Sequence, residues 1–263
     1  MNRLHRLRAL VYPRRCPFCD RVLGLAPECD RCRDRVRALE LRPFRLSSEE
    51  YALPGLDGGA GVYQYEERVR AAILRMKYAG RACYGELLGK LMAARLFGCT
   101  FEVQGDIIIQ TGAPPAALEY DMAVPVPTRN RQRGINPPAV MAAPLAGALG
   151  LPLEPDALRK TRDTPRQEEL DRTRRLLNLV GAFEADPAIV SGARVLLVDD
   201  VLTTGATAVA CAAALRKAGA ESVFVVSLAV RRNQKKEGSS PAAAASAGVW
   251  NRREKNGTER YRH

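Results

Sequence analysis

Val195-Leu-Leu-Val-Asp-Asp-Val-Leu-Thr-Thr-Gly-Ala-Thr207 is the stretch from which the fold can be predicted. The apolar run 195–198 predicts a buried strand, and the alanine-rich residues after Thr207 predict a helix. Two carboxylates, Asp199 and Asp200, stand at the end of the strand, and a loop of small residues joins them to the helix. This order of strand, acidic pair, loop and helix is typical of an α/β protein.

The loop has the residue types of a phosphate site. Unpaired N–H groups in the first turn of a helix attract an anion, and a glycine lets the anion approach the backbone closely. The two carboxylates can accept hydrogen bonds from vicinal hydroxyls, or attract a magnesium ion held by a polyphosphate. A sugar phosphate fits both halves, whereas the alternative is a buried strand followed by an acidic surface turn. The phosphate-binding candidates are Thr203, Thr204, Gly205, Ala206 and Thr207.

This segment resembles the motif with which type I phosphoribosyltransferases bind 5-phosphoribosyl-1-pyrophosphate (PRPP). The resemblance implies that Asp199 and Asp200 bind the ribose hydroxyls and that residues 203–207 bind the 5′-phosphate. It also implies a central, mostly parallel sheet flanked by helices, and Mg²⁺ bound together with PRPP.

Composition divides the chain into three parts. A length of 263 residues with 46% hydrophobic content suits one main domain with appendages. The net charge of +12 belongs to the ends, because residues 1–45 carry 12 arginines against 5 acids and residues 231–263 carry 9 basic residues against 3 acids. We therefore predict an N-terminal helix with a cysteine module in 1–45, the main domain in 46–230 and a disordered basic tail in 231–263. The basic ends are candidates for binding nucleic acid, and a solvated basic surface is the alternative.

Nothing in the sequence predicts a membrane span or a secretory signal. The longest uncharged stretch, 134–153, contains four prolines, and the N-terminus has charge without an apolar core. Seven cysteines, four of them in C-x-x-C pairs, favour a reducing cytoplasm over a disulfide framework.

The two C-x-x-C pairs predict a metal site. Cys16-Pro-Phe-Cys19 and Cys29-Asp-Arg-Cys32 are separated by nine residues, and so short a segment has too little core to fold alone. Four thiolates suit a structural Zn²⁺, because they leave no open coordination position. A thioredoxin-like redox pair and an iron–sulfur cluster are the alternatives.

Two further blocks are rich in arginine. An apolar strand at 122–127 leads into Thr128-Arg-Asn-Arg-Gln-Arg-Gly134 and a helical run that ends at Leu149. The fork-shaped donors of this loop could bind a diphosphate, or the loop could be a solvated turn. Residues 155–183 could cover a bound anion as a lid, or form a charged helix that faces solvent. The pyrophosphate and lid candidates are Arg129, Arg131, Arg133, Arg174 and Arg175.

The remaining periodicity predicts the other elements. We expect strands at 61–65 and 222–230, and helices at 67–80 and 85–97. Residues 98–120 contain Gly112, Pro114 and Pro115, and we predict a loop there, a mobile insertion around the apolar run 107–109.

Taken together, these blocks resemble the ComF family from residue 12 to about 230. In place of the usual Arg-Gly-Phe-Asn-Gln, this chain has Ile135 and Pro137. The matching pieces are the C-x-x-C pairs, Lys77-Tyr78, Pro125-Val-Pro127, Arg133-Gly134 with Asn136, Thr161 with Thr164 and Gln167, Arg175 with Asn178, and the segment from Val198 to Thr207.

The ComF resemblance implies a type I phosphoribosyltransferase fold behind a zinc ribbon. For some members it also implies a part in DNA uptake during natural transformation, and hence single-stranded DNA and competence proteins as partners. The first hypothesis is a phosphoribosyltransferase, a glycosyltransferase with an unidentified acceptor, since no residue stands out as its general base. The second is a non-catalytic protein that binds nucleotides or single-stranded DNA.

Overall fold

The structure is a computed structural model. It describes residues 13–24, 26, 28–47, 51, 53–78, 82–104, 107–114, 119–128, 136–162, 179 and 181–231. Within these ranges, none of the helices has the length and apolar character needed to cross a membrane.

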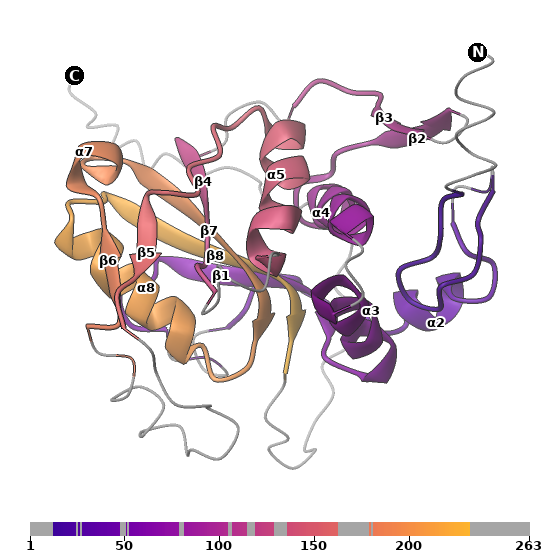
Figure 1. Cartoon of the computed structure of the whole chain (residues 1–263), viewed down its shortest axis with the longest axis horizontal. Coiled ribbons are helices and arrows are strands. Elements are labelled where there is room, and N and C mark those ends of the chain that lie inside the picture. The colour runs from indigo at the N-terminus through magenta and orange to yellow at the C-terminus, as the bar shows by residue number, and fades with distance from the viewer. Residues whose placement is uncertain are drawn as a thin grey trace, which may run out of the picture.

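A four-stranded parallel sheet forms the centre of the molecule (Figure 1). Its strands stand in the order β1, β8, β7 and β4, and each neighbouring pair is parallel. Their bounds are Gly58–Gln64 for β1, Ser222–Val230 for β8, Arg194–Leu202 for β7 and Met122–Pro125 for β4. Because the strands are parallel, their carboxyl ends share one edge of the sheet. The prediction of an α/β fold with a mostly parallel sheet is confirmed.

The two central strands are hydrophobic because both faces of the sheet are covered. Residues 195–198 of β7 and residues 225 and 226 of β8 have no exposed surface. A parallel strand buried on both faces is typically a continuous apolar run, and these two strands follow that pattern.

Helices pack on each face of the sheet (Figure 1). On one side lie α3 (Glu67–Tyr78), α4 (Ala82–Phe97) and α5 (Pro137–Leu149), with α4 packed against α5. On the other side α8 (Ala206–Lys217) lies beside a two-stranded antiparallel ribbon. The ribbon consists of β5 (Leu158–Lys160) and β6 (Phe183–Ala185), and the short α7 (Pro187–Val190) follows it.

Residues 98–120 are not the loop that we predicted. They contain an antiparallel hairpin of β2 (Phe101–Gln104) and β3 (Ile107–Gln110). In β2 the side chains of Phe101 and Val103 are half-buried while those of Glu102 and Gln104 are exposed, which is the alternation of a strand with one covered face. The prediction was wrong because it gave weight to Gly112, Pro114 and Pro115, which come after the hairpin.

The first described residues form a compact module beside β1 and α3. It contains α2 (Arg33–Arg37) and a bridge between Arg15 and Val22. The segment 39–46 then runs antiparallel along β1. Its backbone hydrogen bonds include those from Leu41 N to Val62 O (2.8 Å) and from Leu46 N to Gly59 O (2.8 Å). This segment therefore covers the β1 edge of the sheet.

The predicted N-terminal helix in 1–12 and the predicted tail after Arg231 lie outside the described residues. The strands predicted at 61–65, 122–127, 195–198 and 222–230 are present, and so are the predicted helices at 67–80 and 85–97, the helix that ends at Leu149 and the helix after the Gly205 loop, with bounds that differ by a few residues. In the segment 155–183 the structure describes the strands β5 and β6, which we did not predict, and the middle of that segment lies outside the described residues.

Candidate functional site

Asp199 and Asp200 lie at the carboxyl end of β7. Their exposed fractions are only 6% and 8%, so both carboxylates are buried. Successive side chains of a strand point to opposite faces of the sheet. Asp200 accordingly reaches α3, and Asp199 lies toward α8.

Asp200 forms an ion pair with Lys77 of α3. The Nζ atom of Lys77 lies 2.5 Å from Oδ2 of Asp200, and the two side chains are 32% and 11% exposed. Burial lowers the pKa of Lys77, but the charge of Asp200, the hydrogen bond to Asp200 and the charge of Asp199 together outweigh this effect. The pKa therefore ends above its usual value. Lys77 is therefore a cation that is held at the acidic pair.

Asp199 is held by the backbone of its own strand. Its Oδ1 atom accepts a hydrogen bond of 2.8 Å from the N–H of Asp200. Burial and then the nearby charge of Asp200 raise the pKa of Asp199 well above its usual value. Burial and the charge of Asp199 also raise the pKa of Cys211 in α8. Two buried carboxylates beside one lysine form a site that favours a further cation or hydroxyl donors.

The loop after β7 leads into the first turn of α8, and its geometry resembles that of an anion-binding site. Gly205 is the residue before the helix and has a φ of +77°, a left-handed conformation that glycine adopts at low cost. The N–H of Ala206 donates to Oγ1 of Thr204 at 3.4 Å. The first turn of a helix has N–H groups without intrahelical partners. Thr203, Thr204 and Thr207 are half-buried around it.

Leu53 closes the other side of this loop. A Cβ atom added to Gly205 would lie 2.4 Å from Cδ2 of Leu53. The left-handed backbone conformation therefore favours glycine, and a larger residue at position 205 would also have to displace the end of the Leu53 side chain.

The second strand–loop–helix unit leaves the same edge of the sheet. Pro125, the last residue of β4, pairs with Val198 of β7, and Val126 N donates to Val198 O at 2.9 Å. Asn136 precedes α5, and its Nδ2 donates back to Val126 O at 3.3 Å. The two ends of the loop thus lie close together beside β7, while Arg129, Arg131 and Arg133 lie outside the described residues.

The described parts of the segment 155–183, which we predicted as a lid or a charged helix, include the β5–β6 ribbon. Oγ1 of Thr161 donates to Gly181 O at 3.1 Å, which brings together the chain before and after the segment 163–178. Arg174 and Arg175 lie outside the described residues.

The four N-terminal cysteines come together as predicted. The Sγ atoms of Cys16, Cys19, Cys29 and Cys32 all lie within 4.8 Å of one another, and those of Cys19 and Cys29 are 3.6 Å apart. Zinc–sulfur bonds of about 2.3 Å would place tetrahedral thiolates about 3.8 Å apart, so the cluster could hold a metal ion after a small contraction.

Residues of α3 and α4 fix the cysteine module to the main domain. Arg75 donates to Phe18 O at 2.8 Å and to Pro17 O at 3.1 Å. Tyr84 donates to a carboxylate oxygen of Asp20. The rings of Phe18 and Tyr63 meet edge to face, with centroids 5.9 Å apart. The module and the sheet therefore share one hydrophobic core.

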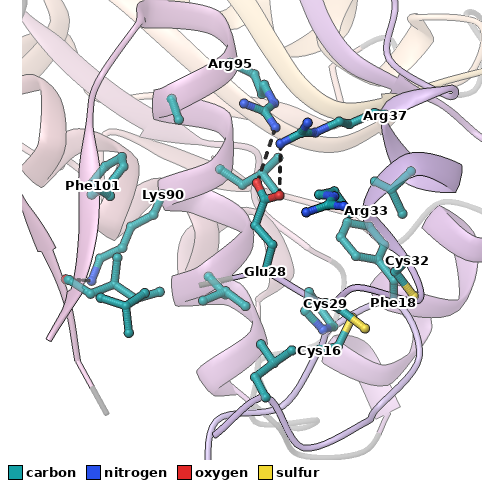
Figure 2. A pocket seen from close by; sticks show the side chains of 18 of the residues that line it. Cys16, Phe18, Glu28, Cys29, Cys32, Arg33, Arg37, Lys90, Arg95 and Phe101 are labelled. Carbon is teal, nitrogen blue, oxygen red and sulfur yellow. Dashed lines mark hydrogen bonds and ion pairs between the residues drawn. The ribbon is translucent and has the colours of Figure 1, made fainter. Parts of the chain in front are cut away.

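A cavity of about 390 Å³ lies between this module, α4 and the β2–β3 hairpin (Figure 2). Figure 2 shows Glu28 between Arg37 and Arg95, at 3.0 Å and 3.9 Å. Lys90 reaches Glu86 and the Ile108 carbonyl, each at 2.8 Å. The cavity walls are mostly apolar, and neither Asp199 nor Asp200 lines them. This cavity is therefore separate from the acidic pair.

Lys77 is a residue of the site that was not predicted from the sequence. Lys77-Tyr78 belongs to the ComF resemblance and to a predicted helix, but neither observation assigned it to the site. Its contact with Asp200 depends on how α3 packs across the end of the sheet, for which the sequence has no local signal.

Comparison with known proteins identifies a family match in the second half of the chain. Residues 139–245 match the family described as phosphoribosyl transferase domain. That range includes Asp199, Asp200 and the loop 203–207. None of the curated proteins matches this chain.

Several solved structures are similar in part. Glutamine phosphoribosylpyrophosphate amidotransferase from B. subtilis, complexed with ADP and GMP, is 26% identical with a TM-score of 0.34; the match covers 54% of this chain and 25% of that one. Adenine phosphoribosyltransferase from Saccharomyces cerevisiae is 23% identical with a TM-score of 0.32; the match covers 60% of this chain and 73% of that one. This chain thus spans about a quarter of the length of the amidotransferase.

Proposed function

We propose that this protein binds PRPP at the carboxyl edge of the sheet and transfers its phosphoribosyl group to an acceptor. The observation that carries the proposal is the buried pair Asp199–Asp200 followed directly by the Gly205 turn and the start of α8. Acidic and anion-binding groups side by side suit a ligand with hydroxyls at one end and a phosphate at the other. The family match over residues 139–245 supports the same ligand class.

Each part of the site has a separate task in this proposal. The helix terminus and the threonines 203, 204 and 207 hold the 5′-phosphate. Asp199 and Asp200 accept hydrogen bonds from the ribose hydroxyls, approaching the sugar from the two faces of β7. A Mg²⁺ ion bound with PRPP supplies charge neutralisation for the pyrophosphate.

The reaction is a substitution at C1 of the ribose. The bond from C1 to the pyrophosphate oxygen breaks and pyrophosphate leaves with the electron pair. A lone pair of the acceptor forms the new bond to C1, and the proton of the acceptor passes to solvent. In this proposal the carboxylates hold the sugar while positive charge develops on it. Arg129, Arg131 and Arg133, in the loop that follows β4, stabilise the departing pyrophosphate. Binding, orientation and charge stabilisation are thus the contributions of this chain.

A turnover screen tests this function. The full chain with Mg²⁺ and PRPP is offered nucleobases, amines and other candidate acceptors, and pyrophosphate release is measured. We expect acceptor-dependent release that Asp199→Asn with Asp200→Asn abolishes. Calorimetry without PRPP binding by the intact chain would refute the proposal. PRPP binding without pyrophosphate release from any acceptor would favour the non-catalytic alternative.

We further propose a ComF-type protein in which Cys16, Cys19, Cys29 and Cys32 hold structural zinc. The closed thiol cluster supports the metal, because four sulfurs leave no position for a substrate. Its position before a phosphoribosyltransferase-like domain supports the family. A role with single-stranded DNA in competence rests on the family resemblance and on the basic ends of the chain.

A further inference from the structure

Lys77 lies where an isolated ammonium group would be energetically unfavourable. Its side chain is only one-third exposed, and burying an ammonium group is unfavourable unless it is paired. Its partner Asp200 is a residue of the proposed ribose site. The pair therefore lies where the ligand must bind.

The helix α3 holds Lys77 firmly in that place. Met76 and Ile73 on the same helix are fully buried in the core. Lys77 follows Met76 and is the second-last residue of the helix, where it meets the carboxyl edge of the sheet. The ammonium is thus presented to the site by a packed element.

Two candidate ligands differ in the group that a cation would recognise. Ribose 5-phosphate and PRPP share the hydroxyls and the 5′-phosphate, but only PRPP carries a pyrophosphate on C1. Hydroxyls alone must compete with Lys77 for Asp200. A pyrophosphate offers the ammonium a stronger acceptor, and three N–H donors allow Lys77 to hold Asp200 and a phosphate oxygen together, or to exchange one for the other.

We infer that Lys77 is a specificity-determining residue, which favours ligands with a pyrophosphate at C1 over ligands that carry only the ribose phosphate. The inference rests on the proposed function, because it takes the ribose site at Asp199 and Asp200 as its starting point. In the free protein Lys77 neutralises Asp200. When PRPP binds, the ammonium interacts with the pyrophosphate, and Asp200 becomes available to the ribose hydroxyls.

Calorimetry of the full chain with two ligands tests the inference. PRPP and ribose 5-phosphate are titrated in the presence of Mg²⁺ into the unmodified chain, Lys77→Met and Lys77→Arg. We expect Lys77→Met to lose about ten- to a hundredfold in PRPP affinity, the equivalent of one charge-assisted hydrogen bond. Its affinity for ribose 5-phosphate should be unchanged or higher, and Lys77→Arg should restore most of the PRPP affinity.

Lys90→Met is the matched control. Lys90 is a part-buried lysine paired with Glu86 on α4, outside the acidic site, so its loss should leave both affinities unchanged. Circular dichroism confirms that each variant is folded, and Lys77→Gln replaces Lys77→Met if the latter does not fold.

The outcomes separate the inference from the function on which it rests. Equal losses for both ligands in the Lys77 variants would overturn the inference, because a merely structural lysine would act on both. An unmodified chain that binds PRPP no better than ribose 5-phosphate would overturn it too, while leaving the phosphoribosyl site intact. An unmodified chain that binds neither ligand would remove the proposed function itself.

Discussion

The cysteine module and the carboxyl edge of the sheet are assembled in different ways. All four thiols of the module come from the short segment 16–32 and lie within 4.8 Å of one another. At the carboxyl edge, Lys77 comes from α3, the carboxylates come from β7, and the Gly205 turn leads into α8. The four thiols of the module are close in sequence and in space. The charged groups at the edge are close in space but come from distant parts of the chain.

Because the two regions are assembled differently, we expect the module to contribute to stability and the carboxyl edge to contribute to ligand binding. Four thiolates around one metal would leave no position for a substrate, so we expect the cluster to stabilise the module and the adjoining core. The edge contains two buried carboxylates with one cationic partner among the described residues, and an external ligand can complete it. Changes in the module should therefore alter stability, and changes at the edge should alter affinity.

The largest effect is expected from opening the module. Cys29→Ser with Cys32→Ser removes half of the thiols, so we expect zinc content near zero and a melting temperature lower by roughly ten degrees or more. Metal analysis and thermal unfolding measure the two quantities. Cys83→Ser, at an exposed cysteine of α4, is the control that should change neither. A double variant that retains one zinc per chain would contradict the closed four-thiol site.

The next effect is a loss of affinity at the edge. Asp199→Asn with Asp200→Asn keeps side-chain size and removes two charge-assisted acceptors, each worth about 1.5–3 kcal/mol. PRPP affinity, measured by calorimetry, should fall by about two to four powers of ten if the losses add. The melting temperature should change little, because the loss of repulsion between two buried carboxylates offsets the loss of the ion pair between Asp200 and Lys77. Equal PRPP binding by the double variant would end the assignment of this edge as a phosphoribosyl site.

Gly205 belongs to the carboxyl edge, but a substitution there should lower both stability and ligand affinity. In Gly205→Ala a Cβ atom enters a left-handed conformation and meets Leu53, so we expect a loss of about 1–2 kcal/mol in unfolding free energy and weaker phosphate binding. Leu53→Ala added to Gly205→Ala should restore the part of the loss that is due to contact with Leu53. Denaturant unfolding of the two single variants and the double variant measures that part as their coupling energy. Strict additivity would show that Leu53 does not restrict residue 205.

The smallest effect on either region should come from removing residues 232–263. If the basic end binds nucleic acid, its deletion should weaken single-stranded DNA binding by about tenfold or less, and the remaining affinity should depend less steeply on salt. Fluorescence anisotropy at several salt concentrations measures this change. Zinc content and PRPP affinity should stay constant. Undiminished DNA binding after the deletion would assign it to another part of the chain.

Features encoded within short segments were predictable from the sequence. The β7–α8 junction and the Cys16–Cys32 cluster each depend on neighbouring residues, and both are present. The β2–β3 hairpin was missed because its strands are short and the prolines that follow it resemble a loop. The Lys77–Asp200 pair was missed because it depends on packing between elements far apart in the chain. The roles of the individual site residues remain predictions.

The segment 39–46 has a consequence for the solubility of shortened chains. It occupies the hydrogen-bonding edge of β1, and residues 152–154 do the same for part of β4 on the far edge. An uncovered edge strand is a template for pairing with another molecule. A chain that began after residue 47 would keep every residue of the acidic pair and of the Gly205 turn, yet would leave the outer edge of β1 unpaired, because only β8 would pair with it. Such a chain should associate edge to edge, so we expect the segment 39–46 also to protect the sheet from aggregation.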